Sequence, residues 1–188
     1  MDAWLDFYAP FFRSRDDARI FVGDLEELDR AAPRHRAKIL MHQTQRLVSL
    51  ADDVEAIRPG KQSLQLTFLM ICCENVAKLF HHFDEDGQSK AYVRRFFDEF
   101  LVETDRTRLA SAITQHDLRP LSIREVADTL YAVRCDVVHE GNYWGFHFHD
   151  GRMPMLNTDP DVNVYIQFSE LRDIVVRGAI QAITRYEP

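Results

Sequence analysis

The sequence predicts a mainly α-helical protein with a small β-hairpin inserted before its last helix. Apolar residues recur at helical spacing over most of the 188 residues, in segments separated by proline, glycine and short polar turns. Between residues 142 and 168 the pattern changes to alternation, which is typical of strands. We therefore expect one helical domain over residues 1–188, with residues 1–33 as an N-terminal helical extension and residues 142–168 as a β-hairpin insertion.

Composition places the chain among ordinary globular proteins, with 46% hydrophobic and 28% charged residues. The formal net charge of −7 argues against extensive binding to a nucleic-acid backbone, but it leaves room for a small cationic site. No apolar run reaches the roughly 18 residues of a membrane span, the amino terminus has no signal-peptide pattern, and the three cysteines form no CxxC motif. We expect a reduced, cytoplasmic protein without membrane contact.

Clear stop signals separate the helical segments. Pro33 and Arg58-Pro59-Gly60 each end a helix. The segment that follows is apolar around most of its circumference, as in a central helix with several neighbours. A capping-box spacing, Ser122-x-x-Glu125, begins the helix that leads to Gly141. The aromatic-rich residues 1–15 are expected to form a short helical turn or an arm packed on the body. The expected helices span residues 16–31, 34–57, 61–83, 88–103, 105–115, 122–140 and 169–186.

Two alternating segments predict the hairpin. They run from Tyr143 to His149 and from Val162 to Phe168, and Asp150-Gly151 is a hairpin turn signal. Alternation would place His147 and His149 on one face, where they form a possible pair of metal ligands. The residues that would complete such a set are His139, Glu140 and Asp150. A strand with its polar face outward is the simpler interpretation, so we expect no metal and no cofactor. The acidic segment Asp84-Glu85-Asp86-Gly87 lacks the ligand spacing of a calcium loop and is expected to be a plain turn.

The helix that ends at Gly141 carries the residues from which a chemistry can be argued. Arg134 projects from its apolar stripe, so the guanidinium needs a partner or must open onto a cleft. Glu74 and Asn75, on the central helix, are the expected partners. His139 lies about 140° further round, in the last turn, with Asp136 roughly on its side. One straight helix does not bring both groups to one atom, whereas two copies facing each other across a twofold axis can.

The segment from Tyr131 to Gly141, with its Arg134-x-x-x-x-His139 spacing, resembles the HEPN superfamily, especially members of abortive-infection and defence systems. The resemblance covers residues 34–186 in helix pattern, although the specific motif is only about ten residues. It implies an antiparallel helical bundle that forms a homodimer and cleaves RNA without metal, with Arg134 and His139 of both copies in one composite site. The resemblance also implies a role as a toxin or in defence, with a cognate antitoxin as a partner. Cys135 takes the place where many active members carry Asn, Asp or His.

These side chains suit RNA cleavage without metal. Histidine as a residue type accepts and donates protons near neutral pH, and arginine is a planar donor for phosphate oxygens. Tyr143 and Trp144 follow closely and are candidates for stacking an RNA base, although core or dimer packing explains them as well. The alternative is structural: Arg134 pairs with Glu74 or Asn75, His139 satisfies the last helix carbonyls, and the chain is a non-catalytic dimerisation or interaction module.

Overall fold

The computed structural model describes residues 2–82, 87–158 and 160–186, and over these the chain is mainly helical with a small three-stranded antiparallel sheet. The acidic residues 84–86 lie outside the described part of the chain. The helices are α1 (Asp2–Tyr8), α2 (Arg15–Ala31), α3 (Arg36–Ile57), α4 (Gln62–Phe80), α5 (Ser89–Glu99), α6 (Glu103–Ala112), α7 (Ile123–Cys135) and α8 (Phe168–Arg185). The shorter elements are a 3-10 turn η1 (Ala9–Phe11), a π-helical turn η2 (Asp136–Glu140), and the strands β1 (Ile113–Gln115), β2 (Met155–Thr158) and β3 (Asp161–Val164).

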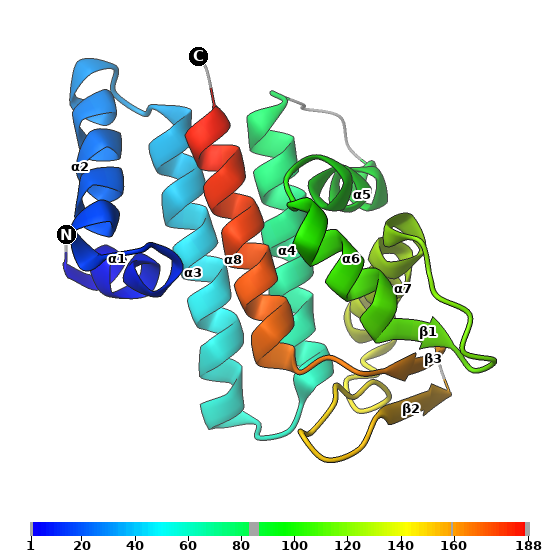
Figure 1. Ribbon diagram of the computed structural model, residues 1–188. Coiled ribbons are helices and arrows are strands. Elements are labelled where there is room, and N and C mark those ends of the chain that lie inside the picture. The colour runs from blue at the N-terminus through cyan, green and yellow to red at the C-terminus, as the bar shows by residue number, and fades with distance from the viewer. Residues whose placement is uncertain (1, 83–86, 159, 187–188) are drawn as a thin grey trace.

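Helices α3, α4 and α8 form the centre of the bundle (Figure 1). Helix α3 runs antiparallel to α4, and α8 lies along both of them. Helix α4 also packs against α5 and α7, which confirms the central helix that its apolar circumference predicts. By length and composition alone α4 could cross a membrane, but more than half of its span is buried inside the protein, as in the core helix of a soluble protein.

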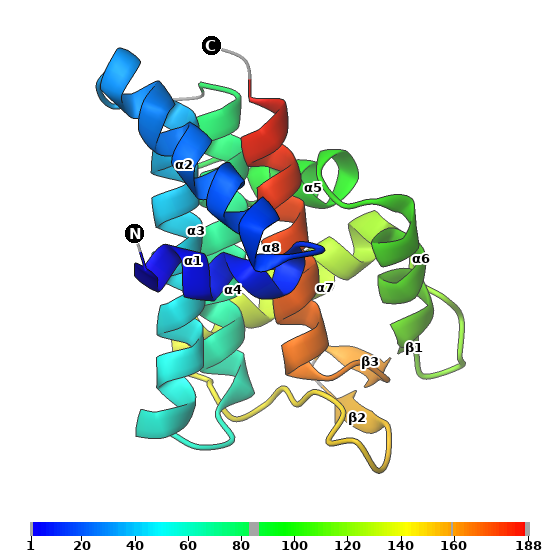
Figure 2. The ribbon, with the colours of Figure 1, turned by 60° about the vertical axis from the view of Figure 1, so that its left-hand side comes forward.

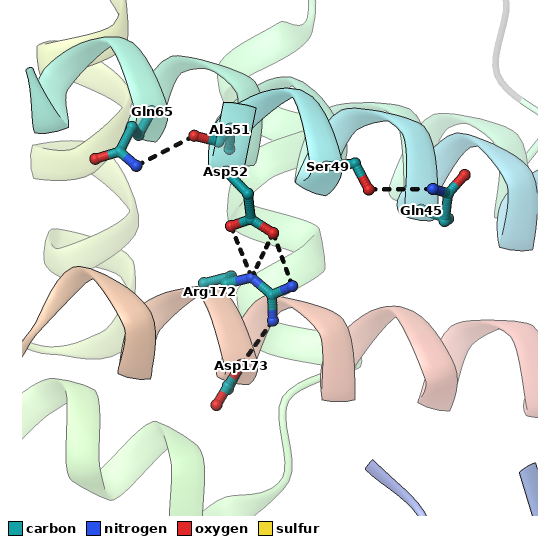
Figure 3. A network of polar contacts seen from close by, with 7 residues as sticks. All are labelled: Gln45, Ser49, Ala51, Asp52, Gln65, Arg172 and Asp173. Carbon is teal, nitrogen blue, oxygen red and sulfur yellow. Dashed lines mark hydrogen bonds and ion pairs between the residues drawn. The ribbon is translucent and has the colours of Figure 1, made fainter. Parts of the chain in front are cut away.

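The N-terminal segment packs across the bundle as α1, η1 and α2 (Figure 2). Tyr8 is fully buried, and its hydroxyl donates a hydrogen bond to the Met41 carbonyl at 2.7 Å. A polar network joins α8 to α3, where Arg172 makes a bidentate contact with Asp52 (2.8 and 2.9 Å) and a 3.0 Å bond with Asp173 (Figure 3). The Arg172 guanidinium carbon also lies 5.6 Å from the ring centroid of Phe7, so this arginine links α1 to the bundle.

The sheet has the strand order β1-β3-β2. Strands β2 and β3 form a hairpin within residues 142–168, as predicted, but its last pair is Thr158 with Asp161, so Asp150-Gly151 is not its turn. The third strand, β1, was expected to be the end of a helix over 105–115. Instead α6 stops at Ala112, and Ile113 pairs with Val164. β-Branched residues at 113 and 114 suit a strand better than a helix end. The helix expected over 88–103 forms as α5 but ends at Glu99, and α6 begins at Glu103, two residues earlier than expected.

Residues 143–149 do not form the expected strand. Their alternation is nevertheless real, since Phe146 and Phe148 are buried while His147 is only half-buried. The backbone of this segment bonds to side chains in place of a neighbouring strand. Gln62 Oε1 accepts from the Phe148 amide at 2.8 Å, Ser63 Oγ donates to the Phe146 carbonyl at 3.1 Å, and Asn157 bonds the amide and carbonyl of His147 (2.7 and 3.0 Å). These bonds satisfy the buried backbone without a ladder.

Candidate functional site

Helix α7, which carries Arg134, begins at the predicted capping box. Ser122 Oγ accepts from the Glu125 amide at 3.3 Å, and the Glu125 carboxylate accepts from the Ser122 amide at 2.7 Å. Arg119 donates to the same carboxylate at 3.0 Å. The hydrogen bond from Arg119, followed by those from Ser122, lowers the pKa of Glu125 from 4.5 to about 2. The carboxylate is therefore charged at neutral pH, where it accepts the hydrogen bond from the N-cap amide of Ser122.

The other end of this helix is a π-helical turn, which the sequence did not predict. The amides of Gly141 and Asn142 both donate to the Asp136 carbonyl, and Gly141 adopts a φ of +69°, in the left-handed region. A π-turn has i→i+5 hydrogen bonds and winds more residues into each turn, so successive side chains rotate by less than the about 100° of an α-helix. His139 therefore projects nearer to the direction of Arg134 than it would on a straight α-helix.

The guanidinium of Arg134 is largely buried between α7 and α4. Its Nη2 atom lies 3.9 Å from Glu74 Oε2, and the two side chains are 17% and 19% exposed. The guanidinium carbon lies 5.5 Å from the ring centroid of Tyr131, within the range of a cation–π contact. Its Nε atom is buried and has no hydrogen-bond partner among the described residues. One long ion pair therefore leaves part of the donor capacity of this arginine unused.

Glu74 and Tyr131 extend this contact into a network that reaches α5. Ser89 Oγ donates to Glu74 Oε1 at 2.7 Å, which orients the carboxylate next to Arg134. Burial raises the pKa of the Tyr131 hydroxyl, and the neighbouring Cys135 adds to the increase, while Arg134 and Ser89 oppose it. Cys135 is half-buried and faces this tyrosine. It thus belongs to the packing around Tyr131.

His139 lies on the surface, in the turn that follows the buried arginine. Within residues 2–82, 87–158 and 160–186, no carboxylate pairs with its ring. Asp136, the first residue of η2, is half-buried and has a partner of its own. The imidazole is therefore accessible to a ligand from solvent.

Exposed apolar residues lie close to His139 in the sequence. Val138 is 50% exposed, and Trp144, two residues after Asn142, is 58% exposed. The rings of Tyr143 and Trp144 meet edge to face with centroids 5.0 Å apart. This pair packs within its own loop, and its outer surface remains open for a base or for another protein.

The expected partner Asn75 lies elsewhere on α4. It lines a pocket between α3 and α4, and no hydrogen bond joins its amide to Arg134 in the part of the chain that the structure describes. Of the two partners that the sequence offers for this arginine, Glu74 is the one in contact. Ser89 and Tyr131 are the members of the network that sequence reasoning missed. Their signal was weak, because a serine at the start of a helix and a tyrosine one turn before an arginine are common.

The alternative metal site does not assemble. His149 Nδ1 accepts a hydrogen bond from the Gly151 amide at 2.9 Å, and Asp150 accepts from the amides of Arg152 and Met153 at 2.8 and 3.2 Å. These local bonds hold the loop together. No group of three or more His, Cys, Asp or Glu side chains suited to a metal ion occurs among the described residues.

No protein-family model matches the chain, and the searches of curated proteins and of solved structures give no match either. The resemblance to the HEPN superfamily therefore depends on the residues from Tyr131 to Gly141 and on the helix pattern around them.

Proposed function

We propose that this protein is a HEPN-like, metal-independent endoribonuclease whose site is completed by Arg134 and His139 of two copies of the chain. The observation that carries the proposal is the state of Arg134: it is held in place by Glu74 and Tyr131, yet its Nε atom has no partner among the described residues. An exposed histidine follows it on the π-turn. A guanidinium held in place five residues before an accessible imidazole suits the charge that develops in phosphoryl transfer.

The reaction requires two proton transfers. One His139 removes the proton of a ribose 2′-hydroxyl, whose oxygen attacks the adjacent phosphorus, and the His139 of the partner copy protonates the leaving 5′-oxygen. The products are a 2′,3′-cyclic phosphate and a 5′-hydroxyl end. Arg134 donates to the non-bridging oxygens as negative charge accumulates on them. Each of these contributions is typically worth about 10²–10⁴-fold in rate.

A homodimer is part of the proposal, and the exposed apolar residues next to His139 support it. Val138 and Trp144 would be covered if two copies of the turn meet around a twofold axis, which also brings the two imidazoles to one cleft. A toxin or defence role in the cytoplasm, with a cognate antitoxin that covers the same surface, extends the proposal.

The decisive experiment is an RNA cleavage assay in EDTA. The wild-type protein is expected to cleave a mixed RNA pool, whereas His139→Ala and Arg134→Ala lose at least about 100-fold in rate. His147→Ala is the matched control, because that ring lies in the neighbouring segment and forms no bond with the described residues. Since His139 is exposed, its alanine variant should melt at the wild-type temperature. Cleavage that survives His139→Ala, or that appears only with added metal, contradicts the mechanism.

Dimer formation is tested separately with Val138→Asp. A charge at this exposed position should give a monomer in light scattering and abolish cleavage while the fold persists. Met153→Asp, at an even more exposed apolar residue (70%), is the control and should remain dimeric and active. An active monomeric Val138→Asp protein contradicts the composite site.

The second candidate is a HEPN-like module for dimerisation or interaction without catalysis. The contact between Glu74 and Arg134 favours it, because a carboxylate already neutralises the cation that cleavage needs. A dimeric wild-type protein that cleaves no RNA in any of these assays, and whose Arg134→Ala variant is destabilised, is the result expected for the module.

A further inference from the structure

The described residues that line the pocket between α3 and α4 carry a net positive charge. The pocket has a volume of about 360 Å³ and lies where α3 begins and α4 ends, at the upper end of both helices in Figure 1. Arg36 and Lys78, both half-buried, line it from the two helices. None of the described lining residues is acidic.

No carboxylate of the described residues pairs with either cation. Arg36 donates only a long hydrogen bond, 3.3 Å, to the Leu79 carbonyl, and neither Arg36 nor Lys78 has a carboxylate partner in the described part of the chain. Arg36 is also the first residue of α3, where the helix dipole is itself positive. Partial burial of the charge and its position at the positive end of the helix dipole each cost free energy. A bound anion lowers both of these costs.

The rest of the lining offers a different kind of contact. Gln43 and Asn75 each present an amide that has no hydrogen bond to the described residues, so each keeps donors and an acceptor for a ligand. Ile39 and Leu79 supply apolar wall between them. Nucleobases combine flat apolar faces with an edge of donors and acceptors, which is the combination that amides and aliphatic side chains recognise.

We propose that this pocket binds a nucleoside monophosphate, with the phosphate held by Arg36 and Lys78 and the base edge held by Gln43 and Asn75. The volume lies within the range of small-molecule sites, about 300–1,000 Å³. The ligand is either a free mononucleotide or the 5′-phosphorylated terminal nucleotide of an RNA strand, because both present the same chemistry. The site goes beyond the proposed cleavage reaction, since it uses neither Arg134 nor His139.

Calorimetric titration tests the proposal with four probes: nucleoside 5′-monophosphates, adenosine, inorganic phosphate, and a short 5′-phosphorylated oligonucleotide that is 2′-O-methylated and therefore cannot be cleaved. At least one mononucleotide should bind, and adenosine and inorganic phosphate should each bind more weakly. Raising the salt concentration should weaken binding, because the attraction is electrostatic. If the mononucleotide binds more tightly than the oligonucleotide, the natural ligand is the free nucleotide; the reverse order assigns an RNA 5′ end.

Lys78→Gln should weaken mononucleotide binding by about tenfold or more, as expected for the loss of one charged hydrogen bond. Arg36→Gln should act in the same way, and Lys78→Gln provides the test if the arginine variant folds poorly. Arg46→Gln is the matched control, because this exposed arginine lies on α3 outside the pocket. His139→Ala should bind as the wild type does, so this result is independent of RNA cleavage. The proposal is overturned if no mononucleotide binds at millimolar concentration, or if Lys78→Gln binds mononucleotides as tightly as the wild type. It is also overturned if inorganic phosphate binds as tightly as the mononucleotide.

Discussion

Glu74 Oε2 lies 3.9 Å from Arg134 Nη2, close enough for an ion pair and too far for a good hydrogen bond. The pair joins the central helix to the helix that carries the candidate site, and Ser89 holds the carboxylate from a third helix. Arg134 is therefore restrained through charge without being fully satisfied. This combination is compatible with the proposed contact between Arg134 and a substrate.

Replacing Glu74 with Gln should lower the free energy of unfolding by about 1–3 kcal/mol, because a largely buried guanidinium loses its counter-charge. Chemical denaturation measures the change. Arg134→Gln and the double variant complete a cycle, in which the double variant should lose less than the two single losses together. Strictly additive losses would show that the two side chains do not interact.

A side chain at position 141 should destabilise the protein. The φ of +69° at Gly141 strains any L-residue, although no atom lies within 4 Å of a Cβ built there. Gly141→Ala is therefore expected to cost about 1 kcal/mol through backbone strain alone and to disturb the π-turn that presents His139. The control is Gly23→Ala, within α2 and equally uncrowded, which should leave the melting temperature unchanged or raise it. If Gly141→Ala and Gly23→Ala change the melting temperature equally, backbone strain at position 141 is contradicted.

Arg172→Ala should destabilise the protein by about 1–2 kcal/mol, since it removes the bidentate contact with Asp52 and the contact with Phe7. Thermal melting should show the loss. Limited proteolysis should show earlier cleavage near α1, because the arginine links that helix to the bundle. Arg152→Ala, at an exposed arginine without a described side-chain partner, serves as the reference. If Arg172→Ala loses no more stability than Arg152→Ala does, the network in Figure 3 does not stabilise the protein.

The capping box at Glu125 should make stability depend on acid. Its pKa is lowered from 4.5 to about 2 in the folded protein, so the unfolded chain binds this proton at a higher pH than the folded chain does. The stabilisation is fully present above about pH 4.5 and is lost as the pH falls through about 2. The melting temperatures of the wild type and of Glu125→Gln should differ above pH 5 and converge toward pH 2. A gap that stays constant down to pH 2 would be inconsistent with the bond from Arg119.

Local signals in the sequence predicted much of the fold. The capping box at Ser122, the stop at Pro59-Gly60 and the apolar circumference of α4 each reflect chemistry within a few residues, and the structure confirms all three. Glu74 as a partner of Arg134 also followed from the sequence, because an arginine on an apolar stripe needs a nearby carboxylate.

The remaining features depend on residues far apart in the chain. Strand β1 exists because Ile113 meets Val164, and residues 143–149 are not a strand because Gln62 and Ser63 bond their backbone. The π-turn has no residue type that marks it, since it differs from an α-turn only in taking one more residue. Hydrophobic periodicity in the sequence also does not predict that Arg36 and Lys78, on two different helices, line the same pocket. Catalysis and dimer formation remain predictions for the assays above.

The pairing of β1 with β3 has a consequence for the order of folding. It closes a loop that contains all of α7, η2 and the segment that follows them, so the candidate site lies between two strands that are distant in the chain. Closing such a loop costs entropy that local helix formation does not, and contacts of this kind form slowly. We expect the helices α3 and α4 to associate first and the loop to close later, so that amide hydrogens of the sheet exchange with solvent before those of α4.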